Sequence, residues 1–154
     1  MDTERRTDAV QDEQGTPGEA GAGAAGPAAD GEPHGELTLR TLAMPADVNV
    51  NGDIFGGWVL AQMDIAGGIV AGERAQGRVA TIAIDAMKFI RPVRVGDVVS
   101  IYARVVRVGR TSVTLALETW ALRNRHGALE KVTEGTFTYV AIDEAGKTRP
   151  LPAA

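Results

Sequence analysis

Hydrophobic and polar residues follow two different patterns after residue 35. Five segments have the apolar–polar patterning that is typical of β-strands. They span residues 36–44, 77–92, 98–108, 111–124 and 130–143. The segment 56–74 differs because it is almost entirely apolar, and its central residues 58–71 contain only two polar side chains, those of Gln62 and Asp64. This pattern predicts one long helix that is apolar on nearly every side.

The order of elements, a strand, a helix and then four strands, predicts an α+β fold. Short turns join the last four strands, so we expect those strands to be antiparallel neighbours. With the first strand they would form a five-stranded antiparallel sheet against one long helix. One sheet can bury only one side of that helix, so we expect a second copy of the chain to cover the other side.

The first 35 residues have a different composition, dominated by Gly, Ala, Pro and acidic residues. They carry eight acidic residues and two arginines, a net charge of −6, whereas the rest of the chain has a net charge of +2. Such a segment buries too little apolar surface to offset the entropy lost on ordering. We therefore expect residues 1–35 to be a disordered acidic tail and residues 36–154 to be the folded domain.

Composition excludes several classes of function. The chain has no cysteine and only two histidines, which excludes disulfides, cysteine nucleophiles and a histidine-rich metal site, so we expect no metal ion and no cofactor. The weak positive charge of the domain does not indicate nucleic-acid binding. No apolar run is long enough for a membrane span, and no signal peptide is visible. We therefore expect a cytoplasmic protein without membrane insertion, which also suits the absence of cysteine.

Asp64 needs an explanation, because burying an unpaired carboxylate is costly. One interpretation is a core or subunit-interface carboxylate that neighbouring donors satisfy. The other is a general base, for which an apolar setting is typical. The pattern alone leaves both open. A serine nucleophile is a weak alternative, because Ser100 and Ser112 lie in or beside strands and the chain has no G-x-S-x-G motif.

Gly56 and Gly57 stand at the predicted helix start, where backbone N–H groups are free and the helix dipole is positive. The pair can be a simple turn or an oxyanion hole. From Gly56, Asp64 lies about 12 Å further along the helix axis and about 80° around it. One helix therefore cannot aim both features at the same carbonyl, whereas two antiparallel helices related by a two-fold axis can. A catalytic site built from them requires a dimer with two composite sites.

Four motifs carry a family resemblance. They are LRTLAMPADVNVNGDIFGGWVLAQMD at 39–64, RVATIAIDAMKFIRPVRVGDVV at 78–99, VGRTSV at 108–113 and FTYVAIDEAGKTRPLP at 137–152. Together they resemble the YciA-type acyl-CoA thioesterases of the hotdog-fold superfamily, over roughly residues 36–152. The most specific part is N-G-D-I-F-G-G followed by Q-M-D.

The resemblance implies a hotdog fold, in which a long helix is wrapped by an antiparallel sheet and two chains form a double-hotdog homodimer, often within a homohexamer. It implies hydrolysis of acyl-CoA to a free acid and CoA. Asp64 matches the catalytic carboxylate, and Gly56 or Gly57 matches the N–H that polarises the thioester carbonyl. Asn51 and Asp53 match polar loop residues at the mouth of the site.

The resemblance also implies a place for the CoA moiety. The residues expected near it are Arg107, Arg110, Thr111 and Ser112, with Arg91 as a weaker candidate for a phosphate contact. A solvated strand end is the other interpretation of these basic and hydroxyl residues.

One position departs from many hotdog thioesterases, which have a histidine immediately before the glycine pair. Here that residue is Phe55, so no histidine is assigned a catalytic role. A hotdog dehydratase or hydratase typically uses a histidine with a carboxylate, which disfavours that class. The alternative outside enzymes is a non-catalytic acyl-CoA-binding hotdog protein, although binding alone does not need a buried carboxylate.

Overall fold

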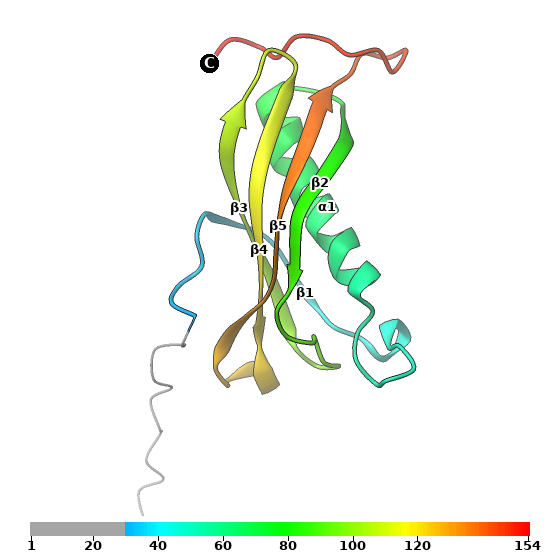
Figure 1. The fold of residues 1–154 in the computed structure, drawn as a ribbon, viewed down its shortest axis with the longest axis vertical. Coiled ribbons are helices and arrows are strands. Elements are labelled where there is room, and N and C mark those ends of the chain that lie inside the picture. Colours follow the sequence, from blue (N-terminus) through cyan, green and yellow to red (C-terminus); the bar gives the residue numbers. More distant parts are fainter. Residues whose placement is uncertain (1–29) are drawn as a thin grey trace, which may run out of the picture.

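The computed structural model describes residues 30–154, which form one helix against one sheet (Figure 1). The strands are β1 (Glu36–Leu42), β2 (Val79–Phe89), β3 (Val98–Val108), β4 (Ser112–Leu122) and β5 (Leu129–Ala141). The helices are α1 (Gly56–Ala75) and two short 3-10 turns, η1 (Pro45–Asp47) and η2 (Arg123–Arg125). These bounds agree with the α+β fold predicted from the sequence, and the helix start agrees to the residue.

The sheet is antiparallel throughout and has the order β1-β3-β4-β5-β2. The prediction that the last four strands pair in chain order is wrong for β2 and β3, which lie apart in the sheet. The connection 90–97 is too long for a tight hairpin. It bonds instead to other parts of the chain: Ile90 N–H donates to the Val132 carbonyl of β5, and the Val93 carbonyl accepts from Ile54 N–H. β2 therefore pairs with β5 and forms one edge of the sheet.

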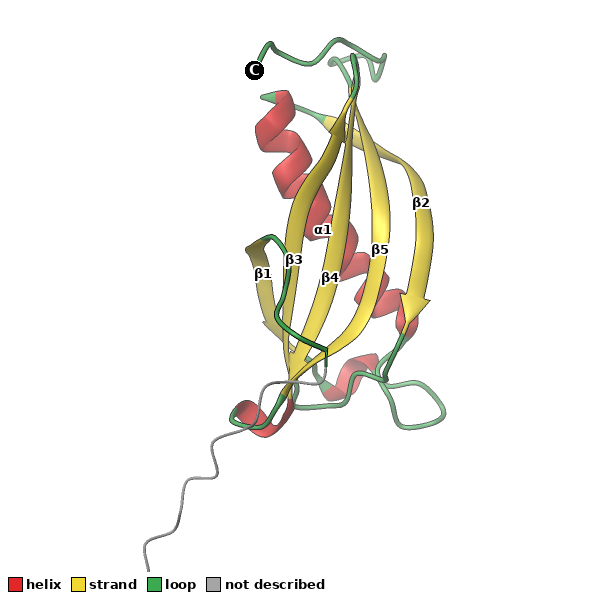
Figure 2. Ribbon diagram, turned by 60° about the vertical axis from the view of Figure 1, so that its left-hand side comes forward, coloured by secondary structure: helices red, strands yellow, loops and turns green. Residues whose placement is uncertain are grey.

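The curved sheet wraps one side of α1 (Figure 2). Apolar side chains from the helix and from the strands meet between them and form the core. They include Val59, Met63, Ala66 and Ala71 of α1, and Leu115, Leu117, Phe137 and Tyr139 of β4 and β5. The other side of α1 is open, since Ile65 is 51% exposed and Ile69 is 46% exposed. A single chain thus buries only half of this apolar helix.

The predicted tail falls partly outside the described residues, because the structure describes the chain only from residue 30. Residues 30–35 contact the folded part of the chain: Asp30 pairs with Arg91 of the connection after β2, and His34 pairs with Glu118 of β4. Between residues 30 and 154, neither α1 nor the shorter helices combine the length and the apolar character that a membrane crossing requires.

Candidate active site

The loop before α1 is organised by a residue that the sequence analysis did not single out. The Asn49 side-chain oxygen Oδ1 accepts from the backbone N–H groups of Asn51 (2.9 Å) and Asp53 (3.2 Å), and Asn49 N–H donates to the Asp53 carbonyl (2.7 Å). Asparagine folds tight turns in this way. The run of Asn, Gly and Asp at 49–53 is the signal that could have identified it.

The start of α1 presents free donors. Phe55, the residue that caps the helix, makes no side-chain capping bond. Its carbonyl accepts from Trp58 and Val59, whereas the N–H groups of Gly56 and Gly57 have no acceptor among residues 30–154. Unpaired N–H groups at the positive end of a helix dipole favour a negatively charged oxygen.

A cleft of about 230 Å³ opens beside this helix start. It lies between the loop before α1, the first turn of α1 and the end of β2. Three of the predicted site residues line it, namely Asp53, Gly56 and Arg91, together with Phe89 and Thr133. Asn51 is exposed on the adjoining loop. The structure thus gathers the predicted loop, glycine and Arg91 positions at one end of the molecule.

Asp64 lies two turns further along α1 and is half-buried. Its carboxylate oxygen Oδ1 accepts hydrogen bonds from the Thr81 hydroxyl of β2 (2.6 Å) and the Tyr139 hydroxyl of β5 (3.1 Å). Burial, together with the neighbouring Asp64 carboxylate, raises the pKa of Tyr139 well above its usual range, so this hydroxyl stays a proton donor. Asp64 is therefore held by two neutral donors.

Thr81 and Tyr139 are functional candidates that the sequence analysis missed. Their contact with Asp64 depends on β2 lying beside β5, where the two residues are direct cross-strand partners. Strand patterning gives no information on which strands become neighbours, so no signal in one sequence brings these residues together.

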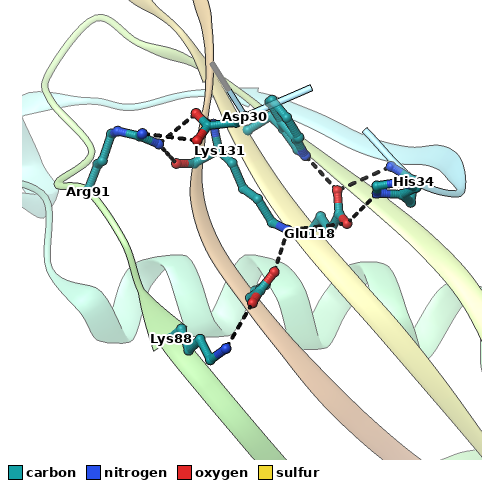
Figure 3. Close-up of polar contacts among 8 residues, drawn as sticks. Asp30, His34, Lys88, Arg91, Glu118 and Lys131 are labelled. Carbon is teal, nitrogen blue, oxygen red and sulfur yellow. Dashed lines mark hydrogen bonds and ion pairs between the residues drawn. The ribbon is translucent and has the colours of Figure 1, made fainter. Parts of the chain in front are cut away.

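Arg91 is already engaged within the chain. Its guanidinium donates to both carboxylate oxygens of Asp30 (2.7 and 3.0 Å) and to the Lys131 carbonyl (2.6 Å). Figure 3 shows Asp30 between Arg91 and Lys131. The hydrogen bond from Arg91 lowers the pKa of Asp30.

The remaining predicted residues lie at the other end of the sheet. Arg110, Thr111 and Ser112 form the turn from β3 to β4, and Arg107 precedes them on β3. The carbonyls of Arg110 and Thr111 accept from Leu151 and Ala141, which fixes this turn against the C-terminal segment. Both arginines are exposed. Within one chain, therefore, the glycine pair lies at one end of the molecule, this turn lies at the other end, and Asp64 lies between them.

Comparison with known proteins agrees with the fold. The family model described as the thioesterase superfamily matches residues 51–128. The acyl-CoA thioester hydrolase YciA of Salmonella typhimurium is 56% identical over 126 residues, which is 80% of this chain and 95% of that protein. The YciA protein of Escherichia coli K12 is 55% identical over 123 residues, covering 78% of this chain and 93% of that protein.

Solved structures give the same result. The hexameric thioesterase y2039 from Yersinia pestis matches with a TM-score of 0.76 and 56% identity, over 79% of this chain and 99% of that one. HI0827, titled a hexameric broad specificity acyl-coenzyme A thioesterase, matches with a TM-score of 0.77 and 46% identity, over 82% of this chain and 88% of that one.

One helix against a five-stranded antiparallel sheet, with these structural neighbours, defines a hotdog fold. The chain belongs to the thioesterase superfamily, and within it to the YciA-type acyl-CoA thioester hydrolases. The resemblance seen in the sequence is thereby confirmed.

Proposed function

We propose that the protein hydrolyses acyl-CoA thioesters to a free acid and CoA. The observation that carries this proposal is Asp64 itself, a half-buried carboxylate in the middle of an apolar helix, held by two neutral hydroxyls. Hydroxyl donors bring no positive charge to a carboxylate, whereas a lysine or arginine partner would compensate its negative charge. The names of the relatives, which are acyl-CoA thioester hydrolases, support the same substrate class.

Asp64 can act in two ways. As a general base it takes a proton from water while the water oxygen attacks the thioester carbonyl, and the tetrahedral intermediate then expels the CoA thiolate. As a nucleophile its own oxygen attacks the carbonyl, expels the thiolate and forms a mixed anhydride that water hydrolyses. In both routes the carbonyl oxygen becomes negatively charged. The free N–H groups of Gly56 and Gly57 are suited to stabilise that charge.

The two features must come from different subunits. The carboxylate lies about 12 Å along the axis of α1 from the helix start, too far for one carbonyl to contact both. In a two-fold dimer with antiparallel helices, the start of one helix lies beside the middle of the other. The exposed apolar residues that such a dimer would cover are Ile65 and Ile69 of α1 and Ile82 and Ile84 of the edge strand β2. By analogy with the hexameric relatives, three such dimers would form a homohexamer.

The CoA moiety would be bound by the exposed turn with Arg107, Arg110, Thr111 and Ser112. Two guanidinium groups and two hydroxyls suit phosphate and pantetheine groups. Asn51 and Asp53 would lie at the mouth of the acyl site. Arg91 is a weaker candidate, because Asp30 already holds its guanidinium. A catalytic domain at 36–154 and a cytoplasmic location remain part of this proposal.

The test is the release of free thiol from a panel of acyl-CoAs of short to long chain length, followed with a colorimetric thiol reagent. We expect turnover with several members of the panel. Measurable binding of acyl-CoA without turnover at any chain length would instead assign the protein as a non-catalytic binding module.

A further inference from the structure

The two hydroxyl groups that hold Asp64 both bind the same carboxylate oxygen. Thr81 Oγ1 lies 2.6 Å and Tyr139 Oη lies 3.1 Å from Oδ1. Within residues 30–154, no side chain or backbone group donates a hydrogen bond to Oδ2. A carboxylate fixed through one oxygen presents the other in a defined direction.

We propose that Tyr139 and Thr81 are positioning residues that anchor Oδ1 of Asp64 and leave Oδ2 free to act on water or on the thioester. The proposal rests on the hydrolase function proposed above and extends it to residues on β5 and β2. Neither residue needs to touch the substrate.

The sheet itself brings the two hydroxyls together. Thr81 and Tyr139 are direct partners in the ladder between β2 and β5, so their side chains leave the same face of the sheet side by side. That face is the one that α1 covers, because the Tyr139 hydroxyl also reaches the Asp64 backbone carbonyl at 3.1 Å. One cross-strand pair therefore supplies two donors to one point on the helix.

Gly67 makes room for the tyrosine. It is buried on α1, three residues after Asp64 and so on the same side of the helix. A Cβ at this position would fall on the Tyr139 hydroxyl and lie only 2.8 Å from its ring carbon Cζ. Glycine is unfavourable inside a helix, so its presence here is explained by the close approach of Tyr139.

The anchor is electrically neutral. The elements packed against Asp64 present Thr81 from β2 and Tyr139 from β5, and in the described part of the chain no lysine, arginine or histidine forms an ion pair with it. Burial keeps Tyr139 protonated, as described above. The hydroxyls fix the direction of the carboxylate and do not cancel its charge.

The first test is Tyr139→Phe, which removes one oxygen and keeps the buried ring. Because hydrogen bonds to a charged group are stronger than those between neutral groups, we expect kcat to fall about tenfold, with KM for acyl-CoA nearly unchanged. Tyr102→Phe, the same change at the other tyrosine of the chain, should alter neither quantity.

Thr81 provides a second test that does not touch the core. Thr81→Val keeps the shape of the side chain and removes the hydroxyl, whereas Thr81→Ser keeps the hydroxyl. We expect Thr81→Val to lower kcat with KM nearly unchanged, as for Tyr139→Phe, and Thr81→Ser to restore kcat.

Asp64→Asn, measured beside these variants, separates the positioning role of Tyr139 and Thr81 from the proposed hydrolase function. If Asp64→Asn is inactive while Tyr139→Phe and Thr81→Val keep the wild-type kcat, the positioning role is wrong and the hydrolase assignment stands. If Asp64→Asn keeps full activity, the proposed function of Asp64 is wrong. An equal loss with Thr81→Val and Thr81→Ser would also overturn the positioning role.

Discussion

Two carboxylates face opposite sides of the sheet and are held in different ways: Asp64 of α1 and Glu118 of β4. Glu118 follows the helix-facing Leu117 on β4, so alternation directs it to the face away from α1. It accepts from the Trp120 indole (2.9 Å), the His34 backbone (3.1 Å) and the Lys131 ammonium (3.4 Å), as Figure 3 shows for the two labelled partners. Asp64 has hydroxyl donors only.

The electrostatic consequences differ as well. Burial opposes the ionisation of Glu118, but the hydrogen bonds from Trp120 and His34 and the charge of Lys131 together lower its pKa. Glu118 therefore contributes its charge to stability. Asp64 is anchored by neutral hydroxyls and has no charged partner in the described chain, so no neighbouring cation compensates its charge there. The comparison separates a carboxylate that stabilises the fold from one for which we propose a role in catalysis.

The largest effect that this comparison predicts is on catalysis. Asp64→Asn keeps the shape but removes the charge, so we expect kcat to fall on the order of 10²-fold or more, the usual scale for losing a general base, with KM changed far less. The variant should be about as stable as the parent, because Asp64 is only half-buried and the asparagine oxygen can still accept from Thr81 and Tyr139. Thermal unfolding and thiol-release kinetics measure the two quantities. An unfolded variant whose folded fraction turns over normally would make Asp64 a structural anchor.

The next largest effect is expected at the arginines, of which one is exposed and one is held by an acidic side chain. Arg110 is exposed on its turn, whereas Asp30 holds Arg91. Arg110→Ala should raise KM for acyl-CoA about tenfold and change kcat less, because a phosphate contact is lost. It should matter little with an acyl-pantetheine substrate, which lacks the nucleotide. Arg91→Ala is the matched control and should raise KM less. A loss of the same size on both substrates would mean that Arg110 is structural.

The third prediction concerns Glu118. Glu118→Gln should lower the free energy of unfolding by about 1–2 kcal/mol at neutral pH, because hydrogen bonds to a charged acceptor are weakened, and kcat should stay unchanged. Since the folded state lowers the pKa of Glu118, its contribution is present above the ordinary glutamate pKa and is lost as the pH falls through the folded value. Chemical denaturation at neutral and acidic pH should show the difference shrinking at acidic pH. A difference that grows at acidic pH would contradict the assignment.

The smallest effect is expected from the N-terminal segment, where two truncations can be compared. Removing residues 1–29 should leave kcat and the melting temperature nearly unchanged, because that stretch has no apolar pattern with which to dock. Removing residues 1–35 also deletes Asp30 and His34, so it should lower the melting temperature slightly. Equal melting temperatures for the two truncations would show that the contacts of Asp30 and His34 add no stability.

The sequence predicted most of the fold and named part of the candidate site, whose function remains a proposal. The apolar helix and the strands could be predicted because burial makes apolar side chains recur with the period of each element. The position of β2 beside β5 could not be predicted, because a connection of the length of 90–97 allows β2 to pair with more than one strand. The Thr81–Tyr139 pair was missed for that reason. The contacts of Asp30 and His34 were missed because composition describes the average of a segment and cannot identify single polar contacts.

The most direct test of the composite site is a crystal structure of the protein bound to a dethia acyl-CoA, in which a methylene group replaces the thioester sulfur. This analogue keeps the carbonyl and cannot be hydrolysed. We expect the carbonyl oxygen within about 3.5 Å of the Gly56 or Gly57 N–H of one subunit, with the Asp64 carboxylate of the other subunit facing the carbonyl carbon. A carbonyl that meets the helix start and Asp64 of the same subunit, or that lies away from Asp64 altogether, would contradict the composite site.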